Sequence, residues 1–271
     1  MIRDITLGQY FPGNSFLYKI DARVKILLTL VYLVLIFAVN NYWGYGAVIV
    51  LLFFAIKSSK IPFKYILKGI KPIMIFIVFT AVLNLFMTDG DILWQWGVIK
   101  ITKQGINYSV FMILRIVLLM MGTSMLTYTT PPVTLTDGIE SLLSPFTKIG
   151  VPAHELAMMM TIALRFIPTL IEETDKIMKA QSARGADFET GNLIKRVKSL
   201  VPLLVPLFIS AFRRADELAT AMECRCYQGG ANRTRLHQLK LTITDFWASL
   251  VTLVFIVAVI VLNIYFGKVI Q

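Results

Sequence analysis

The sequence predicts an all-α polytopic membrane protein with about five transmembrane helices and a cytoplasmic module of amphipathic helices. Of its 271 residues, 56% are hydrophobic and only 16% are charged, and the mean hydropathy is +0.70. Soluble domains are nearer half apolar and about a quarter charged. In addition, the chain has several separate apolar segments of membrane-spanning character, and one long polar region lies before the last of them.

The net charge of +11 has a simple origin in a membrane protein. In a soluble protein it would suggest nucleic acid as a partner. Here an excess of Lys and Arg on cytoplasmic loops accounts for it, and no soluble basic domain is present to bind nucleic acid. We therefore expect the lipid bilayer, and no nucleic acid, as the surroundings of this chain.

The first two spans are predicted as a hairpin. A span needs about 20 apolar residues, and residues 24–39 and 42–56 are slightly short candidates. Asn40 and Asn41 break the apolar pattern between them. Basic residues lie before the first segment and after the second, which puts both ends on one side. The three remaining spans are expected at residues 70–86, 108–128 and 243–266.

The loops set the expected orientation. The loop after the second span carries five lysines and no acid, so it should be cytoplasmic, whereas residues 87–107 balance two acids against two lysines and should be external. The expected parts are a four-span membrane domain at 1–128, a cytoplasmic module at 129–242 and a last transmembrane helix at 243–271. The N-terminus would lie inside and the C-terminus outside a bacterial-type plasma membrane.

Arg115 lies within the fourth predicted span. An ionisable residue in a span is a functional candidate by default. Arg115 is also about 10 Å from the outer end of the span, at 1.5 Å per residue, so its side chain can extend toward the outer surface. The structural interpretation is favoured, and the functional one stays open.

The cytoplasmic module is predicted to contain one short and two long helices. The short helix follows Pro132, with a cap expected near Asp137. The long helices cover about residues 152–183, with a kink at Pro168, and 193–226. Residues 200–212 carry no charge. Either a partner or the chain's own spans would cover the apolar residues there, namely Leu204, Val205, Phe208 and Ile209.

Each long helix closes on an arginine. Residues 182–186 read SARGA and residues 223–227 read ECRCY. Glycine past a helix end is an ordinary stop signal, and arginine in a last turn complements the helix dipole by about 0.3–1 kcal/mol. Two such ends in one cytoplasmic module suggest more, because a rigid guanidinium fits an acidic groove on a partner. The pattern predicts contact with two similar partners.

No catalytic, metal or cofactor site is expected in this chain. Cys224 and Cys226 are too close in sequence for a good disulfide and provide half a metal site at best. The two histidines lie far apart. The glycines at the start of the chain imitate a phosphate-binding loop but lack its lysine.

Several motifs together resemble the transmembrane T component of energy-coupling factor transporters, the EcfT/CbiQ family. The resemblance covers nearly the whole chain. Its motifs are residues 10–15 (YFPGNS), 21–25 (DARVK), 135–138 (LTDG), 163–168 (ALRFIP), 181–186 (QSARGA) and 221–230 (AMECRCYQGG).

The resemblance implies an L-shaped arrangement in which two crossed coupling helices dock into two ABC-type ATPases. A membrane-embedded S component, which binds a vitamin or a transition-metal ion, would sit on the opposite face. The carried-over ATPase-coupling positions are Ala183, Arg184 and Gly185, which match fully, and Cys224, Arg225 and Cys226, where cysteines replace small flanking residues. ATP-driven closure of the two ATPases would move both arginines and rock the S component. The transported substrate is not encoded in this chain.

Two other classes of protein were weighed. A secondary transporter or channel would need ionisable residues near mid-membrane or broken inverted repeats, and only Arg115 qualifies. A membrane enzyme would need clustered His, Asp or Glu at a span end. Asp245 lies beside the last span, where capping of that helix is the simpler role.

Overall fold

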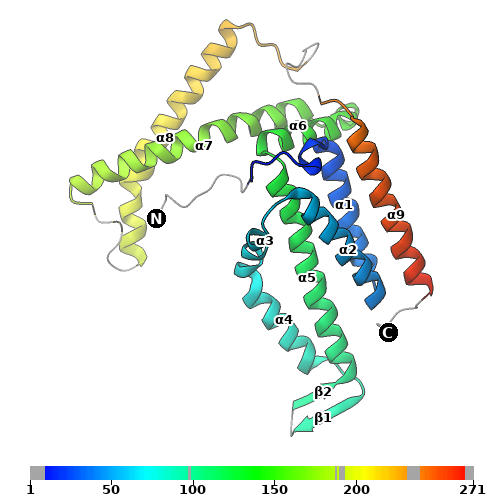
Figure 1. Ribbon diagram of the computed structural model, residues 1–271. Helices are drawn as coiled ribbons and strands as arrows, with labels where there is room; N and C mark the ends of the chain where they lie inside the picture. Colours follow the sequence, from blue (N-terminus) through cyan, green and yellow to red (C-terminus); the bar gives the residue numbers. More distant parts are fainter. Residues whose placement is uncertain (1–9, 97–98, 187, 189–192, 231–238, 266–271) are drawn as a thin grey trace. The chain divides into compact units, whose positions relative to one another are not determined.

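The computed structural model describes residues 10–96, 99–186, 188, 193–230 and 239–265. It divides into two compact units. The membrane unit comprises residues 8–138 and 239–271, and the insert unit comprises residues 1–7 and 139–238. Nearly all described elements are helices (Figure 1). The predicted all-α polytopic membrane class is confirmed.

The membrane unit is arranged around one long helix, α5 (Lys103–Thr129), which packs against α1, α2, α3 and α4. The other elements of this unit, in chain order, are η2 (Phe16–Lys19), α1 (Ala22–Ala38), α2 (Tyr42–Ser59), α3 (Phe63–Ile70), η3 (Lys71–Ile73), α4 (Met74–Met87), the strands β1 (Ile92–Trp96) and β2 (Ile99–Thr102), the start of α6 (Pro132–Leu143), and α9 (Ile243–Tyr265). The core lies between these helices, and Gly122 of α5 allows close contact there. A Cβ on Gly122 would lie 2.0 Å from the ring of Tyr32.

The break between the first two helices is where the asparagines predict it. Asn41 is fully buried and caps α2, because its Oδ1 accepts a 2.6 Å hydrogen bond from the Gly44 backbone N–H. Its Nδ2 donates to the Leu262 carbonyl on α9 at 3.0 Å. One side chain therefore ends the hairpin turn and fastens it to the last helix.

Five helical segments are long and apolar enough to cross a membrane. They are Tyr42–Ser59, Phe63–Met87, Lys103–Thr129, Ala153–Ala183 and Ile243–Tyr265. Four of these match predicted spans, and the third predicted span begins earlier than expected because the lysines of α3 lie within the continuous helical stretch. Ala153–Ala183 was expected as an amphipathic helix instead. The first predicted span, α1, has 17 residues and is slightly shorter than the others.

Three local predictions need correction. Residues 87–107 were expected as a loop but contain an antiparallel hairpin, with Gln95 opposite Lys100 and Trp96 opposite Ile99. The short helix begins at Pro132 rather than near Asp137, since proline suits the first turn of a helix, where its missing N–H is not needed. Helix α8 (Leu193–Cys224) ends at Cys224, two residues before the expected end.

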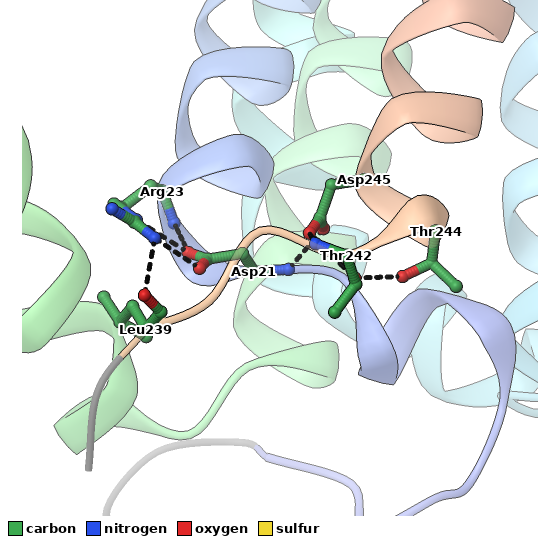
Figure 2. Close-up of polar contacts among 6 residues, drawn as sticks. All are labelled: Asp21, Arg23, Leu239, Thr242, Thr244 and Asp245. Carbon is green, nitrogen blue, oxygen red and sulfur yellow. Dashed lines mark hydrogen bonds and ion pairs between the residues drawn. The ribbon is translucent and has the colours of Figure 1, made fainter. Parts of the chain in front are cut away.

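The beginnings of α1 and α9 are joined by a buried carboxylate (Figure 2). Asp245 Oδ1 accepts the Asp21 backbone N–H at 2.7 Å, and its Oδ2 accepts the Thr242 backbone N–H at 2.6 Å. The second bond is half of a capping box, so the predicted capping role of Asp245 is confirmed. Asp21 in turn caps α1 and pairs with Arg23 at 2.9 Å. Arg23 also donates to the Leu239 carbonyl at 3.0 Å.

The insert unit is formed by the end of α6, η4 (Ser144–Ile149), α7 (Ala153–Ala183) and α8. Figure 1 shows α8 crossing α7, each helix extending beyond the crossing. Helix α7 is continuous through Pro168, and α8 is continuous through Pro202 and Pro206. These two helices, of 31 and 32 residues, carry the arginine motifs at their C-terminal ends.

Candidate coupling site

The C-terminal ends of α7 and α8 have the same backbone structure. At the first, the N–H groups of Arg184 and Ala186 both donate to the Gln181 carbonyl, and that of Gly185 donates to Ser182, all at 3.0 Å. At the second, Arg225 and Tyr227 donate to Met222 at 3.1 Å, and Cys226 donates to Glu223 at 2.8 Å. Both sets form a Schellman motif. The two arginines therefore occupy the same position of the same cap.

The residue after each arginine has a left-handed backbone. Gly185 has φ of +88° and Cys226 has φ of +54°. Glycine adopts this conformation freely, whereas a side chain there costs on the order of 1 kcal/mol. Cys226 is thus the structural counterpart of Gly185, and Cys224 is the counterpart of Ala183. The second motif therefore differs from the first in its side chains and not in its backbone structure.

Both arginine tips are exposed. Arg184, Gly185, Cys224, Arg225 and Cys226 are all solvent-accessible, and so is Ala183. Within the described part of the chain, the guanidinium groups of Arg184 and Arg225 form no hydrogen bond or ion pair. Both side chains are thus available to an acidic partner.

The two helices are held together where they cross. Arg214 Nη2 of α8 donates to Glu173 Oε2 of α7 at 2.9 Å, and the Ser210 hydroxyl donates to Glu173 Oε1. Nearer the end of α7, Gln181 Nε2 donates to the Pro202 carbonyl at 3.4 Å. The later residue of α7, Gln181, contacts the earlier residue of α8, Pro202. The two helices therefore cross in an antiparallel sense.

The Glu173–Arg214 ion pair is equally far in sequence from both tips. Arg184 follows Glu173 by eleven residues, and Arg225 follows Arg214 by eleven residues. At 1.5 Å per residue, each arm is about 16 Å long. Sequence reasoning found the tips but missed this ion pair, although a charged residue at the same distance before each arginine was a usable signal.

A strip of apolar side chains lies on one face of α8. The predicted residues Leu204, Val205, Phe208 and Ile209 belong to it and are 43–60% exposed. The strip, which we call the α8 strip, consists of Leu200, Val201, Leu204, Val205, Phe208, Ile209 and Phe212. Leu203, on another face of the helix, is buried. An exposed apolar face of this size indicates an interaction surface.

A polar chain follows the second tip. Tyr227 Oη lies 3.4 Å from His154 Nε2, and His154 Nδ1 lies 2.9 Å from Glu140 Oε1. Gly230 packs so closely that a Cβ there would lie 2.5 Å from the His154 ring. The segment after the second tip therefore contacts the start of α7, which in turn contacts the end of α6 within the insert unit. No sequence motif pointed to this arrangement.

Arg115 makes local contacts in the membrane unit. Its Nε donates to the Tyr45 hydroxyl at 3.1 Å, and its Nη2 donates to the Val39 carbonyl at 3.4 Å. Its guanidinium also lies 5.7 Å from the centre of the Phe37 ring, within cation–π range. These partners surround the α1–α2 turn. Among the described residues, no group of three or more His, Cys, Asp or Glu side chains could hold a metal ion.

Comparison of the sequence with known proteins gives matches over nearly the whole chain. A family model described as "CbiQ: Cobalt transport protein" matches residues 13–237. Three relatives carry the name "Energy-coupling factor transporter transmembrane protein EcfT". The protein from Clostridium kluyveri is 59% identical, over 99% of this chain and 100% of its own. The protein from Ruminiclostridium cellulolyticum is 56% identical, over 98% of this chain and 100% of its own.

The chain belongs to the EcfT/CbiQ family. The third relative, EcfT from Bacillus subtilis, is 46% identical over 90% of this chain and 93% of its own. Membership gives the protein a role in energy-coupling factor transport as a multi-pass membrane component. A family of transporter components also implies a non-catalytic role for this chain.

Proposed function

We propose that this protein couples two ABC-type ATPases to a membrane-embedded, substrate-binding S component. The observation that carries the proposal is the pair of arginine tips, which share one cap structure and each lie eleven residues beyond the Glu173–Arg214 ion pair. Two helix ends of the same structure suit contact with two similar ATPase subunits. ATP binding and hydrolysis belong to those partners, and this chain transmits their motion. The imported solute, a vitamin or another micronutrient, binds to the S component.

The ion pair at the crossing supports transmission of force. When the two ATPases approach each other, they carry Arg184 and Arg225 with them. The two arms contain no proline, and Glu173 with Arg214 holds them together where they meet. A change in the separation of the tips therefore becomes a change in the angle between α7 and α8.

The α8 strip is the proposed contact surface for the S component. It lies on the same helix as the crossing residues Ser210 and Arg214 but on its exposed face, so a change in the crossing angle turns the strip. An S component seated there would rock with it and present its substrate to the cytoplasm. In this arrangement both tips are cytoplasmic, the N-terminus lies inside and the C-terminus outside.

Co-purification after co-expression with the ATPase pair tests the tips. Wild type is compared with Arg184→Glu, Arg225→Glu and the double variant, and Arg213→Glu is the matched control because it is an exposed arginine of α8 away from the tip. Charge reversal makes each tip negative, so the proposed acidic groove of the ATPase repels it. We expect the double variant to lose the ATPases while eluting as folded protein. Unchanged ATPase retention and unchanged transport would show that both arginines only cap their helices and do not bind the ATPases.

Retention of the S component tests the strip. Phe208→Glu and Ile209→Glu place charges in it, and Ala221→Glu is the control on the same helix outside it. The strip variants should release the S component but keep the ATPases, because the tips are intact. Equal S-component retention in all three variants would exclude the strip as the contact surface.

A further inference from the structure

The membrane unit contains a cavity of about 540 Å³, a size typical of small-molecule sites. Helices α1, α2, α5 and α9 line it together with η2, and it is partly open to the surface, where Phe54 and Trp247 are exposed. This cavity is independent of the arginine tips, since every lining residue belongs to the membrane unit.

The cavity has one polar end and one apolar end. Its lining covers two turns of each of the four helices, between residues 25–32, 51–58, 122–129 and 247–255. At 1.5 Å per residue it is about 11 Å deep. Lys25, Ser58 and Thr129 lie at one end, and Leu51 and Phe255 lie toward the other.

Polar groups farther inside are already used by the protein. The Thr29 hydroxyl donates to the Lys25 carbonyl at 2.7 Å, and the Thr252 hydroxyl donates to the Ala248 carbonyl at 2.9 Å. The Tyr32 hydroxyl donates to the Leu118 carbonyl at 2.8 Å. The interior therefore offers apolar surface to an occupant, and hydrogen bonds are available only near the polar end.

Lys25 is the key residue of the polar end. Only 6% of it is exposed, and its Nζ donates to the Thr129 carbonyl at 3.1 Å and to Thr130 Oγ1 at 3.2 Å. An ammonium group has three donors, and among the described residues the third has no acceptor. A buried cation is costly unless an anion or further hydrogen bonds compensate it.

The two nearby carboxylates attract Lys25 through space, but their hydrogen bonds and ion pairs are formed with other groups. Asp21 forms its ion pair with Arg23, and Asp245 accepts the backbone N–H groups of Asp21 and Thr242. The sequence adds Lys19 and Lys57 next to lining residues at the same end, and both are exposed. Counting Arg23 as well, four basic side chains stand against two carboxylates, so the polar end carries an excess of positive charge.

We propose that this cavity binds an anionic phospholipid, with one acyl chain in the apolar end and the phosphate at Lys25. An 11 Å depth fits within one leaflet, whose hydrocarbon layer is about 15 Å thick. A polar vitamin would leave its hydrogen-bonding groups unsatisfied in this interior, and a free phosphate would leave the apolar end unfilled. The graded lining matches an amphipathic anion.

Native mass spectrometry of the full-length chain in detergent tests the proposal. Palmitoyl-oleoyl phosphatidylglycerol and the corresponding phosphatidylcholine are added separately. Wild type should retain one phosphatidylglycerol molecule in preference to phosphatidylcholine. The double variant Ala55→Leu, Ala248→Leu fills the cavity and should weaken this binding by about tenfold or more, since it removes the space for several buried methylenes. Ala258→Leu, on α9 outside the lining, is the control.

Two substitutions test recognition of the head group. Lys25→Gln should reduce the preference for phosphatidylglycerol by about tenfold, as expected for the loss of a charged hydrogen bond, and Lys25→Arg should keep it. Ser58→Glu leaves the bonds of Lys25 intact and should also reduce the preference. It provides the test if Lys25→Gln does not fold.

Three results would overturn the lipid site. The first is equal phosphatidylglycerol binding by the filled double variant and by wild type. The second is an unchanged head-group preference in Ser58→Glu. The third is displacement of the bound species by inorganic phosphate, which would identify an ion site without an acyl chain.

Discussion

Glu173 of α7 and Arg214 of α8 form a 2.9 Å ion pair and occupy equivalent places, each eleven residues before an arginine tip. The pair marks the point where the two helices cross. Both side chains are only partly exposed, and the Ser210 hydroxyl also donates to Glu173. Glu173 is therefore the residue of α7 that both polar side chains of α8 contact at the crossing.

Exchange of the two charges should preserve transport, whereas loss of one should reduce it. Glu173→Ala and Arg214→Ala each remove one partner, and we expect slower substrate uptake in the complete transporter reconstituted in liposomes. The variant Glu173→Arg, Arg214→Glu restores an ion pair and should recover much of the uptake. A double-mutant cycle on unfolding should give a coupling energy of about 0.2–1 kcal/mol, the range for partly exposed pairs.

Glu172→Ala and Arg213→Ala are the matched controls, since both are exposed neighbours of the pair. They should leave uptake unchanged. If the exchanged variant transports no better than the single variants, the crossing does not depend on this ion pair.

Cys226 occupies the left-handed position that Gly185 occupies at the other tip, so Cys226→Gly should stabilise the second cap. Relief of the unfavourable φ is worth about 1 kcal/mol. Hydrogen exchange of the Tyr227 amide, which closes the cap, should slow by about fivefold. Gly185→Ala should have the opposite effect at the first tip. Space around Gly185 is open, so that cost is conformational and not steric.

Cys224→Ser serves as the control because Cys224 lies in the last helical turn, where its backbone is ordinary. It should leave exchange at the cap unchanged. Faster exchange in Cys226→Gly would mean that the cysteine side chain stabilises the tip by contacts that outweigh its backbone strain.

The sequence predicted elements that depend on local patterns. Arg184 followed by glycine marked the end of α7, and Asn41 marked the α1–α2 turn. The left-handed backbone at Cys226 could not be predicted from residue type, since cysteine rarely adopts it. Glu173 and Arg214 are 41 residues apart, and their pairing depends on where two helices cross. The contacts of Lys25 likewise arise from packing of α1 on α5 and have no local signature.

Arg115 should behave as a structural residue of the α1–α2 turn. Tyr45 is almost fully buried, and its hydroxyl accepts from Arg115. Arg115→Leu leaves that hydroxyl without its partner and should lower the free energy of unfolding by about 1–3 kcal/mol, whereas Tyr45→Phe should cost less. Thermal unfolding in detergent measures both. Loss of transport in an Arg115→Leu protein of unchanged stability would instead indicate a direct functional role.

The carboxylate of Asp21 should make the joined beginnings of α1 and α9 sensitive to acid. Burial alone would raise the pKa of Asp21, but hydrogen bonds from the Arg23 side chain and backbone outweigh it and hold the pKa below its ordinary value. The unfolded chain therefore binds this proton more readily than the folded one. The stabilisation by Asp21 is complete above about pH 4, the ordinary range of an aspartate, and is lost as the pH falls through the lower folded-state value.

Asp21→Asn should accordingly be less stable than wild type at pH 7, by about 1–3 kcal/mol, and the difference should shrink below about pH 4. Unfolding in detergent at pH 7 and in steps from pH 5 to pH 3 measures it. Asp89→Asn, an exposed acid of the same unit, controls for general charge effects and should show little difference at any pH. A gap between Asp21→Asn and wild type that stays constant or widens in acid would contradict the lowered pKa, because a carboxylate held by Arg23 must lose its advantage once it is protonated.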